Sequence, residues 1–426
     1  MTSRWRLGVA GCIALVLLAS ACSTKAKKSD GNSGGGGGGV KTGPGVTAST
    51  INLGVLTDLS GVFAVLGKSI TQGAQLYFDD LNKSGGICGR TVKLNIKDDG
   101  YDVQKAVGLY ADMSSSVLGM EQLLGSPINA ALKQNVESDK MFTIPVSWAS
   151  SILDNPYNMV VGSTYDLETI NGISWLMKNK GLKSGDTIGH IYLQGEYGEN
   201  GYLGSQYAAK QAGLKLVGSQ VTATATDLSS QVASLKSKGV KAIVLTTTPT
   251  QTASAAAVDA ASGLNVPLLG NSPVFVPQLL KTAAGPALEK FLYVTASWQP
   301  YSGDSAAAVK VREAYKAAYP KEVPNGGVDW GYGGATAYAT VLKKACENKD
   351  LTRDGVQAAF RQTTSVDTDG MLPSLDYSHP GDPATREVNV AQADAATEGG
   401  LKQVLPFTAS DLATGYVAPM HGKGGS

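Results

Sequence analysis

Cysteine and histidine, which can bind zinc or act as nucleophile and base, are scarce in this chain. The 426 residues include four cysteines and three histidines, His190, His379 and His421, which stand far apart. Without a Cys-x-x-Cys pair or a His-Glu-x-x-His segment, the sequence offers no zinc site. No Gly-x-Ser-x-Gly segment stands between a predicted strand and a predicted helix, as a serine hydrolase would require. We therefore expect no metal, no cofactor and no enzymatic activity.

One glycine-containing segment comes close to a phosphate-binding loop. Residues 61–69 read GVFAVLGKS, but five residues separate the two glycines where that loop has four. All five are apolar, so we predict an ordinary loop that leads into a helix. The GYGGAT segment at 331–336 falls short of the dinucleotide fingerprint, because no clear strand precedes it.

The first 22 residues have the layout of an export signal. Two arginines precede an apolar run at residues 7–18, which is too short to span a bilayer, since that needs about 20 apolar residues. The small residues ASA at 19–21 then precede Cys22. They fit cleavage after Ala-x-Ala, or a bacterial lipobox in which Cys22 becomes the lipid-modified first residue. A lipobox usually carries Leu where this chain has Ala19.

The segment after Cys22 favours the lipid-anchored alternative. Residues 23–47 contain six consecutive glycines at 34–39, and such a chain cannot bury a core. An anchored protein needs a flexible spacer of this kind, whereas a freely secreted one does not. We predict a signal peptide at 1–21, an anchor cysteine with a linker at 22–48, and a location on the outer face of the bacterial cell membrane.

Outside this leader, two cysteines remain. Cys12 belongs to the signal segment and Cys22 is the anchor candidate, which leaves Cys88 and Cys346 as an even pair. In an oxidising compartment such a pair predicts a disulfide. Two unrelated buried thiols are the alternative, because free cysteine is often buried.

Length and charge bound the class of protein. A single core stops growing beyond about 250–300 residues, so a chain of 426 residues predicts two lobes. The hydrophobic content of 42% and charged content of 17% are typical of globular proteins. Thirty-six basic and 35 acidic residues leave a net charge of +1, which gives no basic surface for nucleic acid.

From residue 50 onward, strand-like and helix-like patterns alternate. Residues 51–55 and 92–96 alternate apolar and polar types as strands do, and 70–81 place apolar residues on one helical face. The rhythm continues with predicted strands at 188–193, 214–217, 242–246 and 292–295, and predicted helices at 201–212, 228–238, 253–261, 306–319, 330–346 and 352–361. This order predicts βαβ units with parallel sheets, arranged as two α/β lobes.

Several segments in this frame form a specific series. They read INLGVLTDLSG at 51–61, GKS at 67–69, DLNKSGGICGR at 80–90, DD at 98–99 and QGEYG at 194–198. The series resembles the leucine/isoleucine/valine-binding proteins, which are type I periplasmic binding proteins of branched-chain amino-acid ABC importers. The resemblance extends from about Thr50 to Pro419.

The resemblance implies two Rossmann-like lobes joined by a three-crossing hinge, with the ligand cleft between them. Lobe 1 would cover 49–165 and 297–373, and lobe 2 would cover 166–296 and 374–420. Cys88 and Cys346 would then both lie in lobe 1, so a bridge would not block lobe closure.

The resemblance also implies ligand contacts in both lobes. In lobe 1, hydroxyl and N–H groups would hold a carboxylate, and the candidates are Ser126, Asn129, Ser147, Trp148 and Ala149. In lobe 2, Tyr197 would lie over the ligand, Asp166 would meet an ammonium group, and Asn271 stands where the family has a second acidic partner.

Four of these residues also have a purely structural interpretation. Ser126 could cap a loop, Trp148 could pack in the core, Tyr197 could lie in an exposed turn and Asp166 could cap a helix. At 270–272 there is no carboxylate, although a buried ammonium needs a paired charge or several acceptors. The ligand could therefore be a branched-chain amino acid or a related small carboxylate, amide or aromatic compound.

We therefore expect a monomeric, lipid-anchored binding protein that closes over a small molecule and delivers it to the permease subunits of an ABC importer. Two alternatives stay open. One is a sensory module of the same fold that does not transport its ligand, and the other is a hydrolase acting in the cleft.

Overall fold

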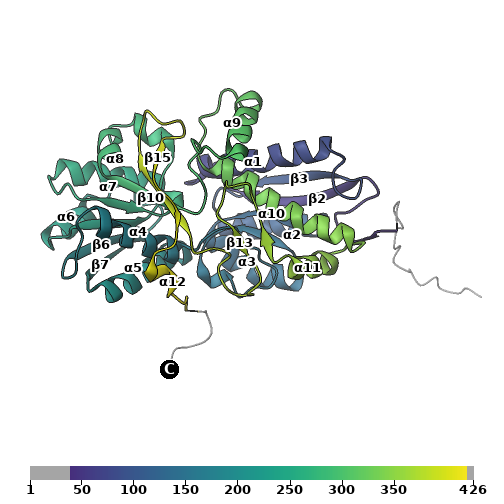
Figure 1. Cartoon of the computed structure of the whole chain (residues 1–426), viewed down its shortest axis with the longest axis horizontal. Helices are drawn as coiled ribbons and strands as arrows, with labels where there is room; N and C mark the ends of the chain where they lie inside the picture. The colour runs from purple at the N-terminus through teal and green to yellow at the C-terminus, as the bar shows by residue number, and fades with distance from the viewer. Residues whose placement is uncertain (1–38, 420–426) are drawn as a thin grey trace, which may run out of the picture. The chain divides into compact units, whose positions relative to one another are not determined.

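The strands form two large sheets, each with its own set of helices (Figure 1). The computed structural model describes residues 39–419. The first sheet is parallel, with the order β3-β2-β4-β5, and consists of β2 (Thr50–Thr57), β3 (Thr91–Asp98), β4 (Met120–Leu124) and β5 (Thr143–Val146). The helices that accompany it are α1 (Ala64–Lys83), α2 (Val103–Ser114), α3 (Ser126–Ser138), α9 (Ala306–Ala318), α10 (Gly327–Glu347) and α11 (Arg353–Gln362).

The second sheet has the order β15-β14-β10-β9-β8-β6-β7. Its parallel strands are β6 (Thr187–Leu193), β7 (Lys215–Val221), β8 (Ala242–Thr246), β9 (Leu268–Gly270) and β10 (Leu292–Ala296). Two antiparallel strands extend it, β14 (Val388–Ala393) and β15 (Leu401–Thr408). The helices of this part are α4 (Tyr165–Asn179), α5 (Glu196–Ala212), α6 (Ser229–Ser237), α7 (Pro249–Ala261), α8 (Gly285–Phe291) and α12 (Asp411–Thr414), with short 3₁₀ turns η1 (Ser150–Ile152), η2 (Ser272–Val274) and η3 (Pro277–Lys281).

Strand composition explains why both sheets lie inside their lobes. All five residues of β4 and all five of β8 are buried, as expected for parallel strands with helices on both faces. On β2, the alternating Ile51, Leu53 and Val55 are fully buried, which matches the period predicted for that strand.

Three segments of the chain connect the two sheets. They are residues 147–164 after β5, 297–305 after β10, and 377–387 before β14. Two short strand pairs complete the structure, β1 (Lys41–Thr42) with β11 (Asp350–Leu351), and β12 (Ser365–Val366) with β13 (Leu375–Asp376). The two Rossmann-like lobes and their three-crossing connection are thereby confirmed, while the exact lobe boundaries stay a prediction.

The first two crossings are bonded to each other. The backbone N–H of Ser163 donates to the Ser297 hydroxyl at 2.8 Å. Gly162 has φ of +115°, and a Cβ there would come within 2.3 Å of the same hydroxyl oxygen. Glycine is therefore required at this position both for its conformation and for the close approach of the two segments.

The leader lies outside the described residues, and so do the predicted signal peptide and the anchor candidate Cys22. Within residues 39–419, no helix is both long and apolar enough to cross a membrane. The same part of the chain has no group of three or more His, Cys, Asp or Glu side chains that could hold a metal ion.

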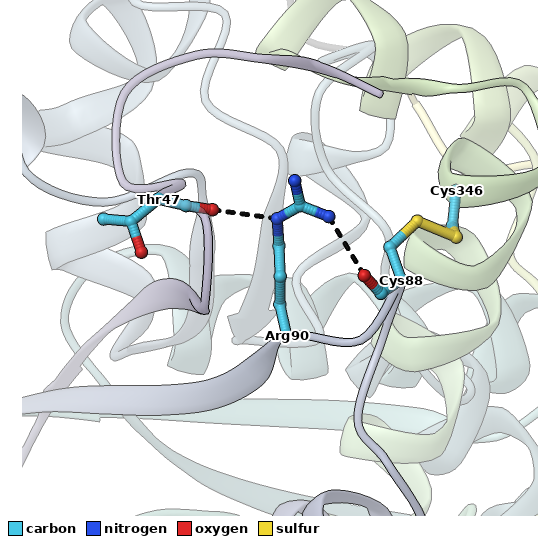
Figure 2. The surroundings of a disulfide bond; sticks show 4 residues. All are labelled: Thr47, Cys88, Arg90 and Cys346. Atoms are coloured by element: carbon cyan, nitrogen blue, oxygen red, sulfur yellow. Dashed lines mark hydrogen bonds between the residues drawn. A yellow bond between two sulfur atoms is a disulfide. The ribbon is translucent and has the colours of Figure 1, made fainter. Parts of the chain in front are cut away.

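A disulfide joins Cys88 to Cys346, whose Cα atoms are 5.8 Å apart (Figure 2). It connects the turn before β3 to the last turn of α10, and α10 packs along α1. Next to it the buried Arg90 donates from Nε to the Thr47 carbonyl at 2.8 Å and from Nη1 to the Cys88 carbonyl at 3.0 Å. Segments that are more than 250 residues apart in the sequence are thus held together at one end of lobe 1.

Replacing both Cys88 and Cys346 by Ser should lower the free energy of unfolding by about 2–4 kcal/mol, because the bridge restricts the unfolded chain. Urea denaturation would measure this on a chain beginning at residue 39, which retains only these two cysteines. Two reactive thiols in unreduced, denatured protein would contradict the bridge.

Candidate functional site

A cavity of about 300 Å³, with open solvent included, lies where the two lobes meet. Its walls come from the carboxyl ends of β4 and β5, from the first turns of α1, α3, α4 and α5, from the loop between β3 and α2, and from η2. The lining residues are Phe63, Leu66, Tyr101, Leu124, Gly125, Ser126, Val146, Trp148, Tyr165, Tyr197 and Pro273. In open α/β sheets ligands bind at this edge, beyond the carboxyl ends of the strands. The described residues that line the cavity include no charged side chain.

One corner of the cavity is polar. Ser126 is the first residue of α3, and the Ser147 hydroxyl donates to the Ser126 hydroxyl oxygen at 2.8 Å. Because Ser126 accepts this bond, its own proton remains available for a second acceptor. The N-terminus of a helix also carries N–H groups that favour an anion. This corner can therefore bind a carboxylate without a cationic side chain.

The backbone of this corner is tightly constrained. Gly125 precedes α3 with φ of +108°, and a Cβ there would come within 2.9 Å of the Tyr101 ring. The Asn129 side chain donates from Nδ2 to the carbonyls of Leu123 and Gly125, at 2.8 and 2.9 Å. Asn129 was predicted to touch the ligand, and it instead lies behind the loop and fixes its shape.

Aromatic rings form the rest of the wall. The rings of Tyr165 and Tyr197 have centroids 4.6 Å apart, and Phe63 of lobe 1 meets Tyr197 of lobe 2 edge to face at 6.2 Å. Burial raises the pKa of Tyr165 and of Tyr197 well above the usual value, so both hydroxyls stay neutral. The Tyr197 hydroxyl donates to the Thr247 carbonyl at 3.3 Å. The ring of Tyr197, rather than its hydroxyl group, therefore forms part of the cavity wall.

The lobe 1 candidates gather at this site to different degrees. Ser126 and Trp148 line the cavity, and Ser147 supports Ser126 from behind. Trp148 donates from Nε1 to the Val161 carbonyl at 2.8 Å, which fixes the indole as part of the wall. Ala149 is buried just beyond, at the start of η1, and is not part of the lining.

The two polar candidates of lobe 2 lie elsewhere. Asp166 is fully buried near the start of α4, where Ser150, Asn200 and Tyr416 donate to its Oδ2 atom at 2.8, 3.2 and 2.9 Å. Thr164 donates to its Oδ1 atom. All these donors belong to the protein, so the expected role of Asp166 toward a ligand ammonium has no support in its position.

Asn271 is likewise engaged by the protein. Its Nδ2 donates to the Tyr165 carbonyl at 3.1 Å, to Glu168 at 3.3 Å and to Thr169 at 3.2 Å. Its Oδ1 accepts from the Thr246 hydroxyl. Asn271 therefore ties η2 to α4 behind the cavity and does not line it.

Sequence reasoning missed four residues that matter here. Phe63, Leu66 and Tyr101 line the cavity, and Glu168 lies buried behind it. The signal for the first two was present, because the apolar run that breaks the phosphate-loop pattern at 61–69 supplies both side chains. Tyr101 and Glu168 had no signal in the sequence.

Glu168 is an unusual acid. Its Oε2 accepts from the Ser272 backbone N–H at 3.1 Å and from Asn271, while Oε1 has no hydrogen-bond partner. Burial raises the pKa of this carboxyl to about 8, with hydrogen bonds from Ser272 and Asn271 opposing the shift. At neutral pH the side chain is therefore mostly protonated.

This shift predicts a pH dependence of stability. Between about pH 4.5 and 8 the folded protein keeps a proton on Glu168 that the unfolded chain releases, so the free energy of unfolding should fall as the pH rises through this window. Glu168→Gln should flatten that dependence relative to the wild type. Chemical denaturation at several pH values would measure the difference, and parallel curves for the two proteins would contradict the assignment.

Comparison with known proteins places this architecture in a family. A family model described as periplasmic binding protein matches residues 50–400. A solved fatty acid ABC transporter substrate-binding protein from Thermomonospora curvata is 44% identical, with a TM-score of 0.87, over 89% of this chain and 98% of that chain. A branched chain amino acid ABC transporter protein from Thermus thermophilus with bound valine is 16% identical, with a TM-score of 0.76, over 87% of this chain and 98% of that one, and shows the fold alone.

Among curated relatives, Leu/Ile/Val-binding protein homolog 8 from Brucella abortus is 27% identical over 220 residues, which are 46% of this chain and 51% of the relative. The chain thus spans about half the length of the curated relatives it matches. These matches confirm the resemblance predicted from the segments at 51–99. The chain belongs to the periplasmic binding protein family.

Proposed function

We propose that this chain is the extracytoplasmic solute-binding protein of an ABC importer and that its lobes close over a carboxylate with an apolar tail. One observation carries the proposal. The cavity combines a hydroxyl pair at a helix N-terminus with walls that are otherwise apolar or aromatic, and no charged side chain lines it. Such a site can donate hydrogen bonds to one anionic group and can bury a hydrocarbon tail away from water.

The carboxylate would lie at Ser126 and the start of α3. Ser126 can donate its proton to one oxygen, and the dipole of α3 favours the negative charge. Tyr165 belongs to the same corner, because it lines the cavity together with Ser126. The aromatic rings would then cover the first carbons of the tail.

The missing charge argues against a free amino acid. A buried ammonium group is costly unless a carboxylate or several acceptors pair with it. Asp166 is occupied by protein donors, and Asn271 presents its amide to α4. The 44% identity to a fatty acid substrate-binding protein also supports a ligand that has a carboxylate group and no ammonium group.

Glu168 favours one second candidate, a branched-chain amino acid. Its Oε1 atom is a buried carboxylate oxygen without a hydrogen-bond partner, and an ammonium group needs an acceptor of this type. Binding would then require Glu168 to lose its proton despite the raised pKa.

Lobe closure would link binding to transport. The cavity takes Ser126 and Trp148 from lobe 1 and Tyr197 from lobe 2, so a ligand that touches all three stabilises the closed arrangement. The closed surface would be read by the permease subunits, with Cys22 as a lipid anchor that keeps the monomer beside them. A sensory module would use the same closure, and a genetic neighbour encoding a permease rather than a sensor kinase would favour transport.

Leucine and 4-methylpentanoate share a carboxylate and a branched tail and differ only in the ammonium group. We expect 4-methylpentanoate to bind at least tenfold more tightly, because the cavity lining offers that ammonium no charged partner. Isothermal titration calorimetry on both compounds would measure the ratio. Tighter binding of leucine, lost in Glu168→Gln, would replace the carboxylate proposal with the amino-acid candidate.

Tyr197→Ala should weaken binding of 4-methylpentanoate at least tenfold, or about 1.4 kcal/mol, since it removes the ring that lobe 2 contributes to the wall. Tyr197→Phe is the matched control and should stay within about threefold of wild type, because the hydroxyl bonds to Thr247 and not to the ligand. Equal losses in the two variants would show that the hydroxyl, not the ring, contacts the ligand.

A further inference from the structure

A second cavity lies on the other side of Leu66. Its volume is about 430 Å³ with open solvent included, and Leu66 lines both cavities. In the turn η2, Pro273 lines the first cavity and its neighbour Ser272 lines the second. The full lining of the second cavity is Leu66, Ser272, Phe275, Val294, Ala296, Trp298, Pro300, Asn325, Gly326, Gly327, Asn389, Ala391, Gly399 and Leu401. One leucine side chain and one turn therefore separate the two spaces.

The second cavity presents mainly hydrocarbon. Its two asparagines are already engaged, since Asn389 donates to the Ala296 carbonyl at 3.0 Å and Asn325 donates to the Ser69 hydroxyl at 2.7 Å. The Asn325 side-chain oxygen accepts from the Gly327 N–H at 2.8 Å. The remaining side chains are almost all aliphatic or aromatic, so a polar ligand group would find few partners there.

Glycines at the start of α10 bring the wall close to the dividing leucine. A Cβ on Gly327 would lie 2.9 Å from Leu66 Cδ1, and a Cβ on Gly326 would lie 2.8 Å from Trp298 Nε1. Leu66 is therefore packed against bare backbone, and a change of its staggered rotamer would join the two cavities that it lines.

We propose that the two cavities form one site, in which the first holds the carboxylate and the second holds the far part of a long acyl chain. The inference rests on the proposed function and names its substrate class, a long-chain monocarboxylate. Leu66, Gly326 and Gly327 come from lobe 1, whereas Val294, Ala391 and Leu401 come from lobe 2. A long chain would thus contact both lobes in each of the two cavities. Each added methylene would therefore stabilise the closed arrangement further.

Chain length tests the inference on the wild-type protein. Each buried methylene should tighten binding by about fourfold until the second cavity is full. We expect hexadecanoate, titrated below its micelle concentration, to bind at least 100-fold more tightly than hexanoate. Hexanoate binding without any gain for hexadecanoate would overturn this inference and leave the proposed function standing, whereas failure of both acids to bind would overturn the two together.

Leu401→Trp fills the second cavity from its partly exposed edge on β15. It should weaken hexadecanoate binding at least tenfold and leave hexanoate within twofold of wild type. Val404→Trp on the same strand is the control, because Val404 is 42% exposed and outside the lining, and it should change neither affinity. Unchanged hexadecanoate binding in folded Leu401→Trp, or equal losses for both acids, would overturn the inference. If thermal unfolding shows that this variant does not fold, the affinities of Ala391→Val for the two acids replace it, with the same expected and contradicting results.

Discussion

The carbonyl oxygen of Val161 is the acceptor on which the arrangement of the site depends. Trp148 and Trp330 both donate their indole N–H to it, at 2.8 and 3.0 Å. Trp148 comes from the end of β5 and Trp330 from α10, so one carbonyl of the first crossing orients a cavity wall and a helix from the last third of the chain. Trp298 of the second crossing packs against Trp148 with ring centroids 5.1 Å apart. Lobe packing and cavity shape are therefore set by the same few contacts.

The βαβ frame could be predicted because its signal is local. The strand at 242–246 was predicted with the bounds that β8 has. The helices predicted at 306–319 and 352–361 differ by one residue at an end from α9 and α11, which cover 306–318 and 353–362. Periodicity of two or 3.6 residues suffices for such elements. Residues 100–187 were not assigned, although they hold β4, β5 and α4. There the strands are short and continuously buried, and a run of that kind has no period that separates strand from helix.

Some residues of the site could likewise be predicted from the sequence, and others could not. Ser126, Trp148 and Tyr197 were predicted from family resemblance, and all three line the cavity. The environment of Asp166 could not be predicted, since its partner Tyr416 lies 250 residues away in the sequence. The same holds for Glu168, whose raised pKa arises from burial that no local pattern encodes.

The path of the chain has a consequence for when each lobe can be completed during synthesis. The strands of the first sheet end at residue 146, yet α10 packs on α1 and Cys346 bonds to Cys88. As the chain leaves the ribosome, lobe 1 must therefore wait for about 200 further residues before its surface is covered. Over that interval the part of α1 that packs on α10 has no partner from its own chain. A nascent chain of this topology should depend on holding factors that keep it unfolded more than a protein whose domains finish in sequence order.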